Sequence, residues 1–158
     1  MDAADEAYTV PVQAAFNKIG ENMKFNRGIK ISAAKVGSYL HFNGKVGVLL
    51  GVDGELADEM LTDLCMHIAF ADPVAITADQ VPADVVEKEK QFILDQVMES
   101  GKPKEIAEKM VEGKMRKFLS GLALLEQPFV KDDKKKVKDV LGAVNVTAFA
   151  RFAVGAGA

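Results

Sequence analysis

Cys65 and His67 are the two neighbouring side chains that could act as nucleophile, base or metal ligand. They lie two residues apart in a segment of helical periodicity, and such residues point to different sides of a helix. Cys65 is next to the apolar stripe of that helix, where a cysteine behaves as a small hydrophobic side chain. Since no third ligand or second base is evident, we interpret both residues as structural.

A phosphate-binding loop is the next candidate, at Gly101-Lys102-Pro103. A P-loop needs Gly, four residues and Gly-Lys-Ser/Thr between a strand and a helix. Here a helical pattern precedes the glycine, and the proline removes a backbone N–H that would hold the phosphate. Carboxylates are plentiful, but none is grouped with a nucleophile and a base. We therefore predict a binding module with no catalytic residue, no metal and no cofactor.

His41 lies near the tip of a predicted hairpin, with Tyr39 and Phe42 beside it. An exposed imidazole and aromatic rings on a rigid hairpin are suited to binding another molecule. The alternative is a solvated loop histidine. The residues alone leave both interpretations open.

The lysine-rich run "KDDKKKVKD", residues 131–139, could indicate contact with RNA. Its aspartates dilute the positive charge, and no aromatic residues are interleaved as stacking platforms. The whole chain has a net charge of −3, which gives no electrostatic case for nucleic acid or acidic membranes. We predict a solvated helix face and no direct contact with nucleic acid.

The composition limits the classes of protein to which this chain can belong. The chain has 158 residues, 49% apolar and 27% charged, which is typical of one globular domain. A single cysteine excludes an internal disulfide and fits a reducing compartment. The acidic start "MDAADEAYTV" lacks the features of a secretory signal, and "VGVLLGV" is too short to span a bilayer. We expect a soluble intracellular domain.

The first part of the chain predicts a tail, a helix and strands. Residues 1–10 form the tail, and Pro11 begins the helix "PVQAAFNKI", which Gly20 ends as its C-terminal cap. The alternation in "MKFNRGIKI", residues 23–31, predicts a strand. The runs "VGSYLHF" and "KVGVLLGV" are joined by Asn43-Gly44, which predicts a β-hairpin with His41 and Lys45 at its tip.

The second part is mainly helical. A four-residue apolar repeat predicts a helix from Glu55 to Ala71. Two long helices follow, from about Ala83 to Ser100 and from about Pro103 to Leu122. The short "SGKP" connection makes them an antiparallel helical hairpin. Its second helix carries a coiled-coil seam that includes Val111, Met115 and Phe118.

The remainder predicts a loop "LEQPFVKDD", a short helix "KKKVKDVLG" and a final strand "VTAFARFAV". The fold class is therefore α+β: a small antiparallel sheet packed with helices and interrupted by a projecting antiparallel helical hairpin. We expect the α+β core to comprise residues 11–82 and 124–158, and the inserted arm to comprise residues 83–123.

Several segments together resemble bacterial and organellar elongation factor Ts. They are "KIGENMKFNR", "GSYLHFNGKVGVLL", "MHIAFADP" and, most specifically, "GKPKEIAEKMVEGKMRKFLSGLALLEQPFVKDD". The resemblance extends from about Lys18 to Gly157 and corresponds to the second half of the family core. It implies a guanine-nucleotide exchange factor of translation that binds elongation factor Tu and loosens GDP.

The resemblance also implies site residues. The "KIGEN" segment and the hairpin histidine dock on the third domain of elongation factor Tu in the family, which indicates Ile19, Gly20, Asn22, His41 and Phe42 here. The helical arm is implicated in dimerisation and in contacts between complexes.

Some family parts have no counterpart in this sequence. The Thr-Asp-Phe-Val element that enters the nucleotide domain is missing, and Thr62-Asp63-Leu64 resembles it only superficially. The small N-terminal helical domain and the C-terminal helix after the last strand are missing too. The resemblance therefore implies docking more directly than exchange by this chain alone.

A second hypothesis belongs to another class. The chain would be a structural or assembly module whose arm mediates dimerisation or partner binding, with Val111, Met115 and Phe118 at the interface. An enzyme using Cys65 and His67 is a remote third. For either binding hypothesis we expect bacterial cytoplasm or an organelle matrix or stroma.

Overall fold

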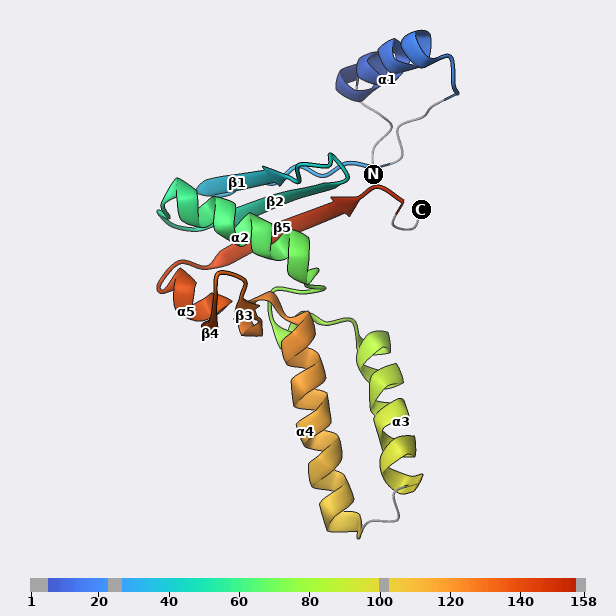
Figure 1. The fold of residues 1–158 in the computed structure, drawn as a ribbon, viewed down its shortest axis with the longest axis vertical. Helices are drawn as coiled ribbons and strands as arrows, with labels where there is room; N and C mark the ends of the chain where they lie inside the picture. Colours follow the sequence, from blue (N-terminus) through green and yellow to red (C-terminus); the bar gives the residue numbers. More distant parts are fainter. Residues whose placement is uncertain (1–5, 23–26, 100–102, 156–158) are drawn as a thin grey trace. The chain divides into compact units, whose positions relative to one another are not determined.

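The computed structural model describes residues 6–22, 27–99 and 103–155. The chain divides into two compact units, residues 1–30 and residues 31–158, and each is described by itself (Figure 1). Predicted features at residues 1–5, 23–26 and 100–102 lie outside the described residues.

The first unit contains helix α1, Glu6–Ile19. It ends as predicted at Gly20, which has a φ of +78° and donates its N–H to the Phe16 carbonyl over 2.8 Å. The predicted start at Pro11 is wrong, because the helix begins at Glu6 and includes the proline. A proline inside a helix removes a backbone hydrogen bond, and here that loss does not end the helix.

The predicted strand over residues 23–31 is also wrong where the structure describes it. Residues 27–31 pair with no strand, and the first strand begins at Lys35. Arg27 and Gly28 interrupt the apolar alternation, and glycine weakens a strand interior because it adds no side-chain packing.

The second unit is built on a three-stranded antiparallel sheet in the order β1-β2-β5. Its strands are β1, Lys35–Leu40, β2, Val46–Val52, and β5, Val146–Ala153, so the predicted hairpin and final strand are confirmed. Gly51 of β2 is required by close packing. A Cβ atom there would lie 2.8 Å from Ile31 and 2.9 Å from Ala33.

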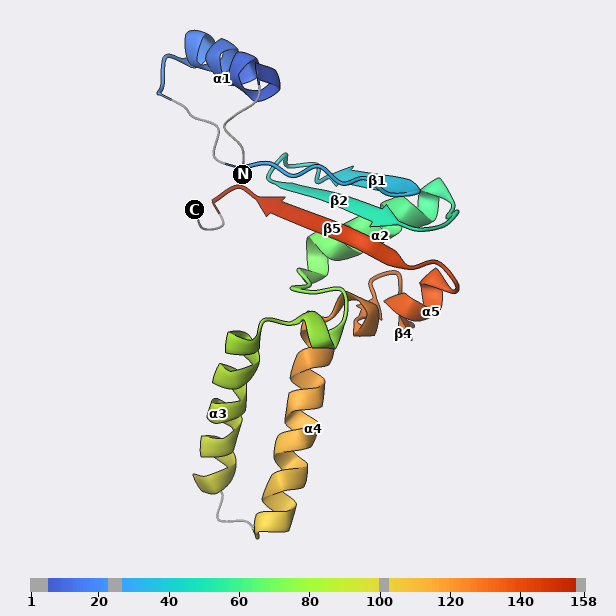
Figure 2. The ribbon, with the colours of Figure 1, turned by 180° about the vertical axis from the view of Figure 1, so that it is seen from behind.

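Helix α2, Asp58–Ala71, covers one face of this sheet (Figures 1 and 2). Alternate β2 residues face it, so Val48, Leu50 and Val52 are buried in one core with Leu64 and Ile68 of the helix. The helix ends at Asp72, which adopts the left-handed conformation. The predicted helix between Glu55 and Ala71 is thereby confirmed, with a start three residues later.

The segment after the arm is more ordered than predicted. The expected loop "LEQPFVKDD" contains most of the short 3-10 helix η2, Leu124–Glu126, together with β3, Pro128–Phe129, and the start of β4, Asp132–Lys136. The predicted helix at residue 134 begins instead at Val137, as α5, Val137–Leu141. The three preceding lysines belong instead to β4, which pairs with β3 through Asp132 and Lys136.

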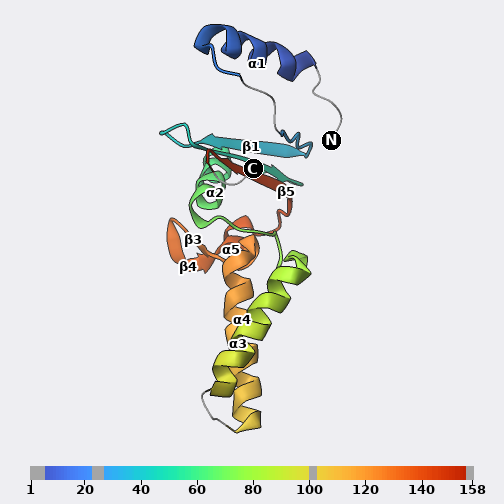
Figure 3. The same cartoon turned by 90° about the vertical axis from the view of Figure 1, so that its right-hand side faces the viewer.

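The arm consists of α3, Ala83–Glu99, and α4, Lys104–Leu122, and confirms the predicted helical hairpin. At its root, Val74 and Leu124 donate backbone N–H groups to Leu122 and Ala75 over 2.9 and 2.8 Å. The short 3-10 helix η1, Ala78–Gln80, connects this root to α3. Figure 3 shows the sheet nearly edge-on, with α2, α5 and the β3–β4 hairpin on one side.

Candidate protein-binding site

The tip of the β1–β2 hairpin is tightly defined by backbone contacts. His41 donates its N–H to the Val46 carbonyl over 2.8 Å, and Gly44 donates to the His41 carbonyl over 2.8 Å. Gly44 has a φ of +68°, which favours glycine. The Asn43 side chain accepts the Lys45 N–H over 2.9 Å. The predicted Asn-Gly turn therefore closes the hairpin.

This tip presents two adjacent rings. The Tyr39 hydroxyl lies 2.9 Å from Nδ1 of His41, and the His41 and Phe42 ring centroids are 4.4 Å apart. When the phenol donates to Nδ1, the imidazole keeps an N–H at Nε2. Phe42 is 91% exposed. An aromatic side chain so exposed on a rigid turn is suited to insertion into a partner.

The other predicted docking residues follow one another at the end of α1. Ile19 is 61% exposed, Gly20 has left-handed geometry, and Asn22 is exposed. An isoleucine at a helix end therefore presents its apolar side chain to solvent. These residues belong to the first unit, and His41 and Phe42 belong to the second.

The predicted arm residues are less accessible than the hairpin tip. Val111, Met115 and Phe118 are all half-buried, at a spacing that keeps them on one face of α4. The opposing helix α3 buries Ile93 and Val97. Lys114 and Gln96 join the two helices through a hydrogen bond of 2.9 Å.

Cys65 and His67 are both buried. Burial raises the pKa of the Cys65 thiol to about 11, so the group stays a neutral thiol at neutral pH. Burial also lowers the pKa of His67, although its hydrogen bond to Gln127 acts in the opposite direction. These positions support the structural interpretation of both residues. No group of three or more His, Cys, Asp and Glu residues within the described ranges could hold a metal ion.

The contacts of His67 define a polar network that sequence reasoning missed. The Val130 N–H donates to Nδ1 over 3.3 Å, so the ring proton is on Nε2 and is donated to Gln127 over 3.0 Å. The Gln127 amide donates in turn to the Gly121 carbonyl over 2.6 Å. The network joins α2 to the root of the arm. No local pattern could have found it, because His67 and Gln127 are 60 residues apart.

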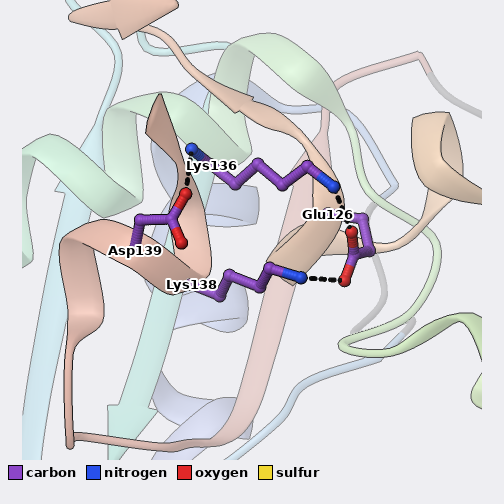
Figure 4. A network of polar contacts seen from close by, with 4 residues as sticks. All are labelled: Glu126, Lys136, Lys138 and Asp139. Carbon is purple, nitrogen blue, oxygen red and sulfur yellow. Dashed lines mark hydrogen bonds and ion pairs between the residues drawn. The ribbon is translucent and has the colours of Figure 1, made fainter. Parts of the chain in front are cut away.

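Two lysines of the lysine-rich run, Lys136 and Lys138, contact the carboxylate of Glu126 (Figure 4). Glu126 accepts hydrogen bonds from Lys136 over 2.6 Å and from Lys138 over 2.8 Å, and these contacts lower its pKa. The Asp139 side chain accepts the Lys136 backbone N–H over 3.0 Å and so caps α5. The run therefore stabilises the junction between η2, β4 and α5.

Comparison with known proteins gives a consistent result. The family model described as elongation factor TS matches residues 3–156. The chain is 48% identical over 144 residues to elongation factor Ts of Halorhodospira halophila, covering 89% of this chain and 48% of that protein. It is 45% identical over 148 residues to the Burkholderia multivorans protein of that name, and the match covers 91% of this chain and 50% of that protein. It is 40% identical over 159 residues to the Ralstonia nicotianae protein of that name, and the match covers 99% of this chain and 53% of that protein.

The chain thus spans about half the length of the curated relatives it matches. None of the helices in the described ranges is long and apolar enough to cross a membrane. With the family match over nearly the whole chain and the α+β fold with its helical arm, the conclusion is that this chain belongs to the elongation factor Ts family.

Proposed function

We propose that this chain binds elongation factor Tu through the hairpin tip and the end of α1, and that binding favours release of GDP. The observation that carries the proposal is the hairpin tip. His41 is held by Tyr39, and Phe42 beside it is 91% exposed. Family membership supports the choice of partner.

The proposed contact set contains His41 and Phe42 in one unit and Ile19, Gly20 and Asn22 in the other. The apolar members, Phe42 and Ile19, are 91% and 61% exposed, so binding would remove both from water. At Gly20 a larger side chain is disfavoured by the φ of +78° alone.

Nucleotide release through binding is a case of thermodynamic coupling. A protein that binds the nucleotide-free GTPase more tightly than the GDP-bound form weakens GDP affinity by the same factor. Such an effect needs no nucleophile, base or metal on the exchange factor. The buried neutral Cys65 and His67 have no part in it.

The test is the release of a fluorescent GDP analogue from elongation factor Tu, with this chain added in increasing amounts. Faster release supports both binding and exchange. Unchanged release together with competition against intact elongation factor Ts supports binding and contradicts release of GDP by this chain alone. Failure to compete contradicts the proposal.

The proposed surface is tested with His41→Ala and Gly20→Asp combined. Both positions are outside the buried core, so the strain that Gly20→Asp introduces at a φ of +78° should stay local to the end of α1, and circular dichroism checks this. We expect the affinity for elongation factor Tu to fall by at least about tenfold, as for central interface residues. A Phe92→Ala variant on α3, where the ring is 56% exposed, is the matched control. An unchanged affinity in the double variant would show that the surface is assigned wrongly.

We propose the assembly function as the second candidate because the arm exposes apolar side chains. Met98 is 76% exposed and Ile106 is 49% exposed, while Val111, Met115 and Phe118 are half-buried. Self-association through the arm would cover Met98 and Ile106. Sedimentation at high protein concentration tests this function, and a monomer there contradicts the dimer.

A further inference from the structure

The root of the arm is attached to the core by apolar packing and by a buried amide. Leu124 is 1% exposed and belongs to the core cluster of α2 and the sheet. Gln127, three residues further along the chain, is 4% exposed and makes polar contacts with several elements. Apolar burial is non-directional, whereas a hydrogen bond weakens steeply when its angle changes. A buried amide at this place can therefore fix a direction that apolar packing leaves open.

The orientation of the Gln127 amide follows from its neighbours. The Val130 N–H donates to Nδ1 of His67 over 3.3 Å, so the single proton of the neutral imidazole is on Nε2. That N–H donates to the amide oxygen of Gln127 over 3.0 Å. The amide nitrogen must then point away from the imidazole ring. His67 thereby selects one of the two orientations that the amide could adopt.

The amide nitrogen of Gln127 reaches the ends of two helices. It donates to the Gly121 carbonyl over 2.6 Å, in the last turn of α4, and it lies 3.5 Å from the carbonyl oxygen of Ala71, the last residue of α2. The last four carbonyls of a helix have no partner within the helix. Gln127 therefore caps an arm helix and a core helix with one side chain.

The backbone contacts of the root serve a different purpose. Leu124 and Leu125, which follow α4, donate N–H groups to the carbonyls of Ala75 and Ile76, which precede α3, over 2.8 and 3.1 Å. These bonds join the two connecting segments of the arm to each other. They can therefore persist when the arm turns as a single piece, whereas the contacts of Gln127 with His67 and α2 cannot.

We infer that Gln127 sets the direction of the arm relative to α2 and the sheet, and that His67 acts through Gln127 as a positioning residue. Loss of either side chain would let the arm turn about its root while the arm and the core both stay folded. The inference goes beyond the proposed function, because it concerns the arm alone and holds or fails whether or not the chain binds elongation factor Tu.

The test measures the distance between the arm and the sheet with two spin labels. Lys109→Cys in α4 and Ser38→Cys in β1 replace exposed residues and carry the labels. Cys65 is kept, because its buried neutral thiol reacts slowly. Double electron–electron resonance gives the distribution of distances. Gln127→Met keeps the length of the side chain and removes its hydrogen bonds, so we expect the distribution to broaden and its mean to shift.

A matched control separates the direction of the arm from general stability. Val52→Ala removes apolar volume from β2 at a position that is 0% exposed, so it also destabilises the fold, but it leaves the Gln127 contacts intact. Its distance distribution should match that of the labelled parent, and circular dichroism checks that each variant keeps its helices. The inference is overturned if Gln127→Met leaves the distribution as narrow as in the parent, or if Val52→Ala broadens it equally. A broad distribution in the parent would also overturn it.

The contribution of His67 is tested with His67→Phe in the same labelled chain. Phenylalanine fills the volume of the ring but has no N–H to hold the Gln127 oxygen, so we expect the same broadening. The combined His67→Phe and Gln127→Met variant should broaden the distribution no further than either change alone, because two residues that act through one contact are not additive. A narrow distribution in His67→Phe, or additive broadening in the combined variant, would show that His67 does not act through Gln127.

Discussion

The sheet core and the helical arm bury their apolar side chains to very different degrees. In the core, Leu50, Leu64 and Ile68 are at most 1% exposed. In the arm, α3 buries only Ile93 and Val97, and α4 buries none of its residues 104–122. The core is therefore stabilised mainly by burial, whereas the arm depends on a narrow seam and on its own helical hydrogen bonds.

One ion pair from each region shows a similar difference. On the arm, Glu112 and Arg116 pair within one helix over 2.8 Å, and both side chains are more than two-thirds exposed. In the core, Lys131 contacts an Asp63 side chain that is only 10% exposed. Exposed helix pairs contribute a few tenths of a kcal/mol. The packed core therefore positions the hairpin tip, while surface residues of the arm can change with little effect on the stability of the fold.

The largest effect is expected from a cavity in the core. Leu64→Ala removes a side chain that is 1% exposed between α2 and the sheet. We expect the free energy of unfolding to fall by about 3 kcal/mol, within the range for buried leucines. Chemical denaturation measures it. A loss below about 1 kcal/mol would contradict the division between core and arm.

The equivalent change in the arm should lower the free energy of unfolding by less, and its effect should be confined to the arm. Ile93→Ala removes the side chain of α3 that is 3% exposed in the seam. We expect a loss of about 2 kcal/mol, because the lightly packed arm can close around the cavity. Hydrogen exchange should become faster at α3 and α4 amides and stay unchanged in β2. Equal acceleration in β2 would mean that the arm and the core unfold as one unit.

Protonation of His67 at acidic pH should lower the stability of the folded core. Burial lowers its pKa in the folded protein, so the unfolded chain binds a proton that the folded chain does not. The contribution of the neutral imidazole is complete above the ordinary pKa of about 6.5 and is lost as the pH falls through the folded value. Denaturation at several pH values should show stability falling below pH ~6.5.

A His67→Gln variant isolates that contribution. It removes the proton uptake, so the slope of stability against pH should flatten in this window. Asp53 and Asp58 have pKa values lowered by hydrogen bonds from Asn145 and Lys35, so they act at more acidic pH. An unchanged slope in the variant would exclude His67 as the source.

The smallest effect is expected at the Glu126 junction of Figure 4. Glu126→Gln weakens its pairs with Lys136 and Lys138, whose side chains are both 47% exposed. We expect a loss of at most about 1 kcal/mol, because partly exposed ion pairs are screened by water and salt. Thermal unfolding at low and high salt checks this, and the difference between variant and parent should shrink at high salt. A loss as large as that of Leu64→Ala would be unexpected.

Much of the fold could be predicted where the signal is local. Asn43-Gly44 marked the hairpin, Gly20 marked the end of α1, and the apolar repeat marked both helices of the arm. The strand predicted over residues 23–31 failed in its described part because alternation alone supplies no pairing partner. The β3–β4 hairpin was missed because its strands carry charged and turn-forming residues that read as a loop.

The candidate site shows the same limit. Sequence resemblance indicated His41 and Phe42, and the structure gave His41 its contact with Tyr39. Phe70 of α2 and the adjacent Val130 and Lys131 of the β3–β4 turn, which line a hollow beside the hairpin, carry no signal of their own, since these two segments meet only in the folded chain.

The family, the helical arm and the hairpin could be predicted from the sequence, because short-range periodicity, turn residues and matching segments all involve residues that are close together in the chain. The buried link between His67 and Gln127 and the hollow beside the hairpin follow only from the folded arrangement. Burial and the shape of a surface depend on residues far apart in the chain, and these residues come together only when the core packs.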